Sequence, residues 1–296
     1  MSDQTDGKPQ VSVCVITYNH EDYLTQCLDS ILNQKTGFSF EVIIGEDAST
    51  DGSRKVIESY LLKYQQIKLL DKVPNMGAIP NFIRTLEASS TKYIAFCEGD
   101  DYWIDELKLQ KQFNFLENNP EYGGVSTNNL WYYEDSDQFE ESKVEEGPVT
   151  FEALCRANVI NSQSILFKRI LLDSLDWIRN LKMGDWPLHL MITAHQPYYR
   201  LKDISTVYRV HGGGIHSGLK QVEKVQNQVE VLAAVLNSLQ LNEERSSLLK
   251  NCIKLLYLRL IALRTKSLNS IRKKYYELGG NPFNKTILKS YLYELF

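Results

Sequence analysis

Three carboxylates, Glu98, Asp100 and Asp101, lie within four positions in the segment CEGDDYW, directly after the apolar run KYIAF. Clustered Asp and Glu without Cys or convergent His are typical ligands of a hard cation, Mg²⁺ or Mn²⁺, which commonly binds through one or two carboxylates and substrate phosphates. Such an ion would also let a diphosphate enter an acidic crevice that otherwise repels it. These residues therefore predict a divalent-metal site for a phosphorylated ligand.

Two further polar groups follow apolar segments of the chain. Their members are Thr17, Tyr18 and Asn19, and Glu46 and Asp47. The elements that must position all three groups alternate between strands and helices. Short β-branched apolar runs predict strands, and apolar residues at helical spacing predict helices. The predicted strands are residues 11–17, 40–46, 67–71 and 91–98, and the predicted helices are residues 21–34, 50–64 and 80–90.

This alternation indicates right-handed βαβ units and a mostly parallel sheet covered by helices on both faces, an α/β fold. Ligands bind such sheets outside the carboxyl ends of the strands. We therefore expect the three polar groups to meet at one edge of the sheet.

The second half of the chain is less regular. Residues 123–133 and 160–168 predict strands, residues 134–147 an acidic surface loop, and a helix is expected to begin near Trp186 or Pro187. From about residue 221 the pattern is helical. The expected organisation is a catalytic domain of residues 1–219 and a helical C-terminal extension of residues 220–296.

Composition and charge exclude several classes. The net charge of −4 conceals an asymmetry, because residues 220–296 hold 13 Lys and Arg against 6 Glu and no Asp, a surplus of seven positive charges, which leaves −11 on the rest. An acidic body argues against nucleic-acid binding. No apolar stretch approaches about 18 residues and the first residues are polar, so a cytoplasmic protein is expected. The five cysteines predict neither a disulfide framework nor a zinc site.

Glycine-rich phosphate loops are absent: the chain has no G-x-x-x-x-G-K-[ST], and no G-x-G-x-x-G follows the first predicted strand. Five other segments lie in order along residues 10–217: VSVCVITYNHEDYLTQCLDSIL, VIIGEDASTDGS, AFCEGDDYW, MGDW and YRVHGGG. Together they resemble the successive motifs of the family 2 glycosyltransferases of the GT-A fold. The resemblance implies inverting sugar transfer from a nucleotide sugar, usually UDP-linked, with Mn²⁺ or Mg²⁺.

For the donor, the resemblance implies that Thr17, Tyr18 and Asn19 border the nucleobase, with Glu46 beside them, and that the Asp47 carboxylate accepts a hydrogen bond from the base. A carboxylate suits the imide N–H of uracil, and thymine has the same group. A structural alternative for Asp47 is that it caps the following helix, although Thr50 or Asp51 could also do so.

The D-x-D motif of the family falls on Glu98-Gly99-Asp100. Asp100 is implied as the primary metal ligand. Glu98 stands where the family has Asp, and its longer arm could reach a ribose hydroxyl. Asp101 is expected to orient the sugar or brace the loop, and Gly99 to let the backbone approach the ligand closely.

His211 matches a family position where a His can complete the metal shell, and imidazole suits Mn²⁺. The alternative is a surface histidine beside a glycine-rich turn. Arg209 could pair with the diphosphate, residues 212–214 could close over it, and His216 is a second metal candidate.

Asp185, in KMGDWPLHL, matches the carboxylate base of the family, which would deprotonate the acceptor hydroxyl. Its alternative role is to N-cap a helix that has Pro187 as its first residue. Of the two tryptophans beside acidic residues, we predict that Trp186 contacts the acceptor and that Trp103 is part of the pocket wall.

The acceptor implied by the resemblance is a saccharide or lipid-linked saccharide, in surface-polysaccharide assembly. Residues 250–274 hold eight basic and no acidic residues among apolar ones, which indicates either a helix lying on an anionic membrane or one packed on the acidic body. Two other functions stay open: a sugar nucleotidyltransferase, although its basic glycine-rich loop is missing, and a catalytically silent nucleotide-sugar binding protein.

Overall fold

The first half of the chain folds into the predicted alternation of strands and helices. The computed structural model describes residues 8–213, 219–263 and 268–287. In chain order the elements up to the acidic segment are β1 (Val11–Thr17), α1 (Glu21–Leu32), β2 (Phe40–Glu46), α2 (Ser53–Leu61), β3 (Ile67–Leu69), α3 (Ala78–Glu87) and β4 (Tyr93–Glu98). Every strand and helix predicted before residue 100 is therefore present, with ends shifted by a few residues.

The remaining elements of the α/β part are shorter and more varied. They are β5 (Tyr102–Trp103), α4 (Lys108–Asn118), β6 (Gly124–Tyr133), the 3-10 helix η1 (Glu134–Ser136), β7 (Gln138–Glu141), β8 (Gly147–Val149), α5 (Phe151–Arg156), η2 (Ser162–Ser164), β9 (Leu166–Lys168), η3 (Arg169–Leu171), η4 (Asp176–Ile178), α6 (Asp185–His195) and β10 (Tyr198–Val210).

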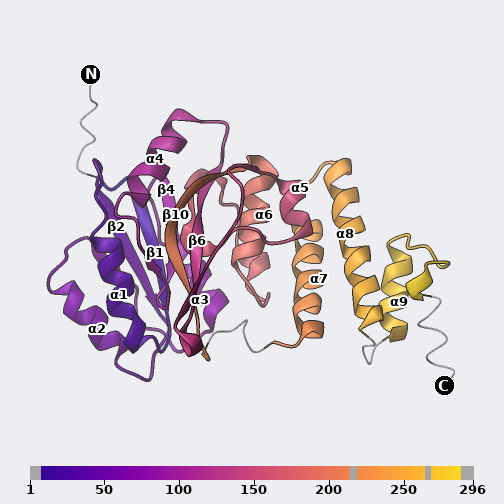
Figure 1. Ribbon diagram of the computed structural model, residues 1–296, viewed down its shortest axis with the longest axis horizontal. Coiled ribbons are helices and arrows are strands. Elements are labelled where there is room, and N and C mark those ends of the chain that lie inside the picture. Colours follow the sequence, from indigo (N-terminus) through magenta and orange to yellow (C-terminus); the bar gives the residue numbers. More distant parts are fainter. Residues whose placement is uncertain (1–7, 214–218, 264–267, 288–296) are drawn as a thin grey trace.

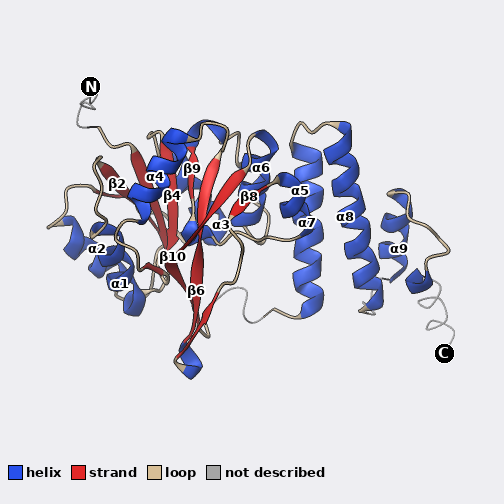
Figure 2. Ribbon diagram, turned by 45° about the horizontal axis from the view of Figure 1, so that its top comes forward, coloured by secondary structure: helices blue, strands red, loops and turns tan. Residues whose placement is uncertain are grey.

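The strands form one mixed sheet in the order β3-β2-β1-β4-β9-β6-β10-β5, with β7 paired to β6 and β8 to β10 (Figure 2). The pairs of β1, β2, β3 and β4 are parallel, as predicted, whereas β9 runs antiparallel to both of its neighbours. In the parallel register Thr17 lies opposite Glu46, and Ile16 lies opposite Glu98. The ends of β1, β2 and β4 thus meet at one edge, as expected.

Alternation along β1 divides its side chains between two apolar clusters, one on each face of the sheet. Val13 and Val15 pack with α1, α2 and α4, and Cys14 packs on the other side with α3 and the later helices. A strand that is buried on both faces is apolar at every position rather than at every second one. This explains why VSVCVIT is mostly apolar on both faces; its buried Ser12 donates a hydrogen bond to Glu41. The helices on both sides of the sheet are visible in Figure 1.

Two predictions for the second half were wrong. The expected acidic loop 134–147 contains η1 and the strand β7, which forms a hairpin with β6. All four residues of β7 are exposed, so the strand carries no buried apolar pattern that the sequence could reveal. In the expected strand 160–168, only Leu166–Lys168 forms a strand, and the polar residues Ser162–Ser164 before it form η2.

Three helices follow the sheet: α7 (Gln221–Ser238), α8 (Glu243–Ala262) and α9 (Leu268–Glu277). α7 packs on α6, α8 packs on α7 and α5, and α9 packs on α8 (Figure 1). One apolar cluster runs without a break from Cys14 through these helices to Ile287. None of the helices in the described ranges combines the length and apolar character that a membrane crossing requires.

Candidate functional site

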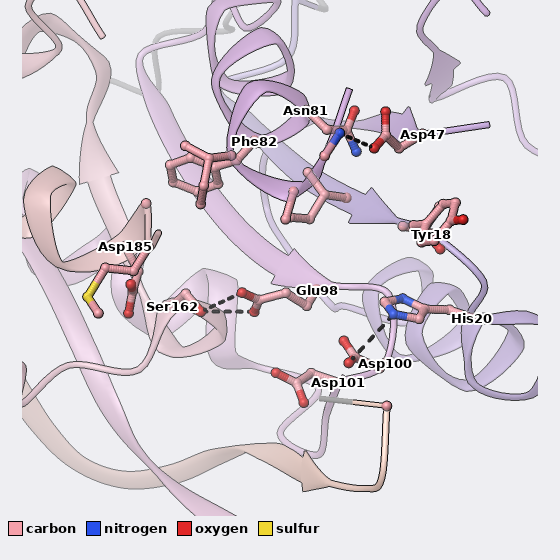
Figure 3. A pocket seen from close by; sticks show the side chains of 18 of the residues that line it. Tyr18, His20, Asp47, Asn81, Phe82, Glu98, Asp100, Asp101, Ser162 and Asp185 are labelled. Atoms are coloured by element: carbon pink, nitrogen blue, oxygen red, sulfur yellow. Dashed lines mark hydrogen bonds and ion pairs between the residues drawn. The ribbon is translucent and has the colours of Figure 1, made fainter. Parts of the chain in front are cut away.

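A cavity of about 390 Å³ opens at the edge where β1, β2 and β4 end. Its size falls within the range of small-molecule sites. Of the predicted site residues, those that line it are Thr17, Tyr18, Asp47, Glu98, Asp100, Asp101, Asp185 and Arg209. The other predicted site residues, Asn19, Glu46, Gly99, Trp186 and His211, are not part of its lining. Figure 3 shows Asp185 on the opposite side of the pocket from Asp47 and Tyr18, with Glu98 between.

Asp100 lies between two imidazoles. Its Oδ2 is 3.0 Å from Nε2 of His211 and 3.6 Å from Nε2 of His20. Burial works to raise the pKa of Asp100, but the hydrogen bond with His211 and the nearby His20 outweigh it, and the pKa is lowered. The same hydrogen bond raises the pKa of His211, whereas burial lowers the pKa of His20. Asp100 is therefore held as a carboxylate.

Asp100 and its two imidazole neighbours, His211 and His20, could supply some of the ligands of a divalent cation but not all of them. Across the described residues, no group of three or more His, Cys, Asp or Glu side chains is placed to hold a metal ion by itself. One carboxylate with one or two imidazoles is a donor set that suits Mn²⁺, and substrate phosphates commonly supply the missing ligands. Asp101 Oδ2, which is buried without a hydrogen-bond partner, is one more oxygen beside this group. The residues present thus fit a cation that arrives with a diphosphate.

Glu98 carries a strongly perturbed carboxyl group. Both of its oxygens accept hydrogen bonds from Ser162 Oγ, at 3.1 and 2.9 Å. Burial, followed by the charge of Asp100, raises the pKa of Glu98 to about 8, with a smaller contribution from Asp185. A carboxyl group that keeps its proton at neutral pH can donate as well as accept a hydrogen bond. This property suits contact with a sugar or ribose hydroxyl.

Arg209 holds the acidic loop in place. Its backbone N–H donates to Asp101 Oδ1 at 2.8 Å, and its Nε donates to the backbone carbonyl of Asp100 at 2.8 Å. The guanidinium also donates to Gln26 and lies over the rings of Tyr23, Tyr102 and Tyr132. The Arg209 side chain therefore already has protein partners, and it braces the loop that carries Asp100. Asp101 is buried, and burial together with Asp100 raises its pKa.

Asp47 is held by the segment that precedes α3. Its two carboxylate oxygens accept the backbone N–H groups of Met76 and Gly77 at 2.9 and 2.8 Å. The alternative role, capping of α2, does not belong to Asp47, because the N-cap of α2 is Gly52. The N–H of Ser53, the first residue of the helix, donates to Asp51 Oδ1 at 2.9 Å. Each carboxylate oxygen has a second lone pair, so Asp47 can still accept from a base.

Three residues predicted to bind the donor also make contacts within the protein, and their donor role stays a prediction. Glu46 accepts the N–H of Ser49 and pairs with Arg54 at 3.1 Å. Asn19 has a positive φ of 55° and accepts the N–H of Thr50 at 2.8 Å. At Gly99, a Cβ would lie 2.9 Å from side-chain atoms of both His20 and Thr17, so the glycine permits close contact with the end of β1 rather than with the cavity.

Asp185 is the first residue of α6, and Gly184 is the N-cap. No side chain caps this helix, so the predicted capping role of Asp185 is wrong, and Pro187 is its third residue rather than its first. Instead, Asp185 Oδ2 accepts a hydrogen bond from Asn158 Nδ2 at 2.7 Å. The carboxylate lines the cavity, where an acceptor hydroxyl could reach it.

The predicted acceptor contact at Trp186 is wrong. Its side chain is 2% exposed, belongs to the apolar core and donates its indole N–H to the carbonyl of Leu154 at 2.9 Å. Because Trp186 follows Asp185 on a helix, its side chain points away from the cavity into the core. Trp103 is also buried and lies under the ammonium of Lys108. The expected candidate His216 lies outside the described residues.

Sequence reasoning missed several residues that line the cavity or contact its carboxylates. They are His20, Asn81, Phe82, Asn158, Asn161 and Ser162. His20 directly follows Thr17, Tyr18 and Asn19, so its place after β1 was a usable signal. Ser162 is 64 residues from Glu98 in the chain, and no local pattern connects the two.

Comparisons with known proteins identify the family. A model of Glycosyl transferase family 2 matches residues 12–169. An uncharacterized protein of Mycobacterium tuberculosis is 33% identical over 253 residues, which cover 80% of this chain and 71% of that protein. The putative teichuronic acid biosynthesis glycosyltransferase TuaG of Bacillus subtilis is 36% identical over 112 residues, 38% of this chain and 44% of that protein.

Two solved structures share the fold. Residues 1–349 of S. aureus TarS, in complex with UDP-GlcNAc, match with a TM-score of 0.63 and 18% identity over 91% of this chain and 89% of that one. The mannosyltransferase PcManGT of Pyrobaculum calidifontis, in complex with GDP-Man and Mn²⁺, matches with a TM-score of 0.64 and 17% identity. The match covers 98% of this chain and 81% of PcManGT. At these identities the likeness concerns the fold, and it confirms the predicted GT-A architecture.

Proposed function

The chain belongs to glycosyl transferase family 2, and on this premise we propose that it transfers a sugar, with inversion, from a UDP-linked donor to a hydroxyl of a saccharide or lipid-linked saccharide. The sequence motifs and the family model both support sugar transfer. The donor nucleotide, the acceptor and the stereochemistry are the parts that this proposal adds. Its proposed setting is surface-polysaccharide assembly in the cytoplasm. The similarity to TuaG, a putative teichuronic acid biosynthesis glycosyltransferase, supports the polysaccharide part of this setting.

The observation that carries the proposal is the placement of three chemically different groups around one cavity. Asp47 lies at one side and Asp185 lies across from it (Figure 3). Asp100 also lines the cavity, and its carboxylate is hydrogen-bonded to His211, which lies outside the lining. A nucleotide sugar has three matching parts, namely a base, a diphosphate and a sugar. We assign the base to Asp47, the diphosphate to Asp100 and the sugar to the space between Glu98 and Asp185.

In the proposed reaction, Asp185 accepts the proton of the acceptor hydroxyl as its oxygen attacks the anomeric carbon. The new C–O bond forms on the face opposite the diphosphate, and the bond to the phosphate oxygen breaks in the same displacement. A bound Mn²⁺ or Mg²⁺ would neutralise charge on the leaving diphosphate. Asp100 and His211 would hold that ion. Arg209 keeps the loop that carries Asp100 in place by a hydrogen bond from its Nε to the Asp100 carbonyl.

Glu98 and Ser162 are assigned to the donor hydroxyls. They hydrogen-bond to one another, and both line the cavity between the diphosphate and sugar positions. The raised pKa of Glu98 lets it act as a neutral hydrogen-bond donor at pH 7. This assignment also accounts for Glu standing where the family has Asp, because a hydroxyl contact needs reach rather than charge.

The C-terminal helices carry a second part of the proposal, peripheral contact with the membrane that holds a lipid-linked acceptor. We propose that this extension begins at residue 220. Its apolar side chains belong to the same core cluster as those on one face of the sheet. Lys250, Lys273 and Lys274 are exposed on α8 and α9, as is Leu255. Replacing the three lysines with Glu should abolish co-sedimentation with anionic lipid vesicles. Unchanged co-sedimentation would remove the membrane from the proposal.

The test of the main proposal is a panel of UDP-glucose, UDP-N-acetylglucosamine and GDP-mannose with Mn²⁺, first by thermal shift and then by assay of nucleotide release with saccharide acceptors. A donor at 100 times its Kd should stabilise the protein by about 2.7 kcal/mol. We expect a UDP sugar to give the largest shift and an acceptor-dependent release of UDP. Binding without turnover would indicate a nucleotide-sugar binding protein, and release of pyrophosphate from sugar phosphate and UTP a nucleotidyltransferase.

A further inference from the structure

Asn158 is the side chain that contacts the carboxylate proposed as the base. It lies in the loop that follows α5, is exposed to solvent, and donates from Nδ2 to Asp185 Oδ2 at 2.7 Å. Its own Oδ1 accepts the backbone N–H of Ile160 at 3.5 Å. That contact, although long, favours the orientation in which the amide NH₂ group faces Asp185.

The contact leaves the other oxygen of Asp185 available. Among the hydrogen bonds of the described residues, the one from Asn158 is the only one that the Asp185 side chain accepts. A carboxylate that lines a cavity and has one oxygen held by a hydrogen bond has a defined rotamer and a defined direction for accepting a proton. A base needs both, since proton transfer requires hydrogen-bond reach of the hydroxyl.

The loop that carries Asn158 is itself anchored to the rest of the site. Arg200, which is buried, donates to the carbonyl of Val159. Asn161 donates to the side chain of Asn129, and Ser162 donates to Glu98. Residues 158–162 thus connect Asp185 at one end to Glu98 at the other, and Figure 3 shows Ser162 between these two carboxyl groups.

We propose that Asn158 is a positioning residue, which aims the Asp185 carboxylate at the acceptor hydroxyl and sets its distance from the donor groups through the loop 158–162. This inference rests on the proposed function of Asp185. It goes beyond that function because it names an exposed loop residue on which the base depends. If the Asn158 side chain served only to pack within its loop, the variants Asn158→Ala and Asn158→Asp would have different effects from those of a positioning residue.

The two informative substitutions are Asn158→Ala, which removes the donor, and Asn158→Asp, which keeps the shape but replaces the donor with a second carboxylate. Positioning predicts that kcat falls on the order of tenfold in Asn158→Ala and further in Asn158→Asp, with donor KM within about twofold of wild type. A shape role predicts the reverse order, because Asp fills the same space as Asn. Asn118→Ala, an exposed asparagine on α4 with one side-chain hydrogen bond, is the matched control.

Two further measurements keep failure of this inference separate from failure of the proposed function. If Asp185→Asn lowers turnover while both Asn158 variants keep wild-type kcat, Asp185 is the base and the positioning role is overturned. If no donor of the panel is turned over, the side-chain amide of Asn158 is followed by ¹H–¹⁵N NMR. A shift of its resonances in Asp185→Ala supports the contact, and unchanged resonances contradict it.

Discussion

His211 and Asp100 are 111 residues apart in the chain, yet Nε2 of one lies 3.0 Å from Oδ2 of the other. The last residues of β10 reach the loop after β4 because β10 pairs with β5, which directly follows that loop. The backbone N–H of Arg209 adds a second tie, to Asp101. Two distant segments are thereby combined into one group of oxygen and nitrogen donors.

Asp100→Asn should remove the cation dependence of donor binding. The amide has no charge to neutralise a divalent cation, so we expect Mn²⁺ to lose most of its effect on UDP affinity. Isothermal titration of UDP with Mn²⁺ and with EDTA measures this difference. Asp176→Asn, which changes an exposed side chain on the 3-10 helix η4, is the control. A full Mn²⁺ effect in Asp100→Asn would show that the ion binds elsewhere.

Asp185→Asn should lower turnover by on the order of a hundredfold or more while UDP affinity changes little. The substitution keeps the size of the side chain and removes its ability to take a proton. Steady-state assays at saturating donor give kcat, and titration gives the affinity. Near-normal turnover would remove Asp185 from its proposed role.

Trp186→Ala should destabilise the fold by about 3–5 kcal/mol, because it empties a core position and leaves the Leu154 carbonyl without its indole donor. Trp186→Phe should retain most of the packing, and its acceptor KM should stay at the wild-type value. Urea unfolding and acceptor titration test the two parts. Trp177→Ala, at a partly buried position, is the control. A large rise of acceptor KM in folded Trp186→Phe would restore the acceptor role.

Buried His189 should make the fold sensitive to mild acid. Burial lowers its pKa from 6.5 to about 4, and its Nε2 has no hydrogen-bond partner. Between pH 6.5 and about pH 4, His189 is protonated in the unfolded chain but neutral in the folded protein. The free energy of unfolding therefore falls as the pH falls through this range. His189→Gln should therefore lose less stability than wild type between pH 7 and pH 5 in urea unfolding. His195→Gln, an exposed histidine on the same helix, should follow wild type. Parallel losses in all three proteins would contradict the assignment.

The sequence was least informative for two segments, β7 and η2, which are held by hydrogen bonds rather than by apolar side-chain packing. β7 is exposed along its whole length and exists because it pairs with β6. The polar segment of η2 is held by its own turns and by the bond of Ser162 to Glu98. Neither segment has the apolar periodicity on which strand prediction relies.

The amino-acid sequence alone determined the alternation of strands and helices, the parallel edge where Asp47 and Asp100 meet, and the family. These features follow from apolar periodicity and from motifs, which are local properties of the chain. Tertiary structure decided which polar side chains remain available to a ligand. Glu46 and Trp186 are adjacent to site residues in sequence. In the fold, however, Glu46 forms an ion pair with Arg54, and the Trp186 side chain packs in the apolar core. Asn158 belongs to no motif, and it reaches Asp185, 27 positions further along the chain, because the fold brings the two residues together.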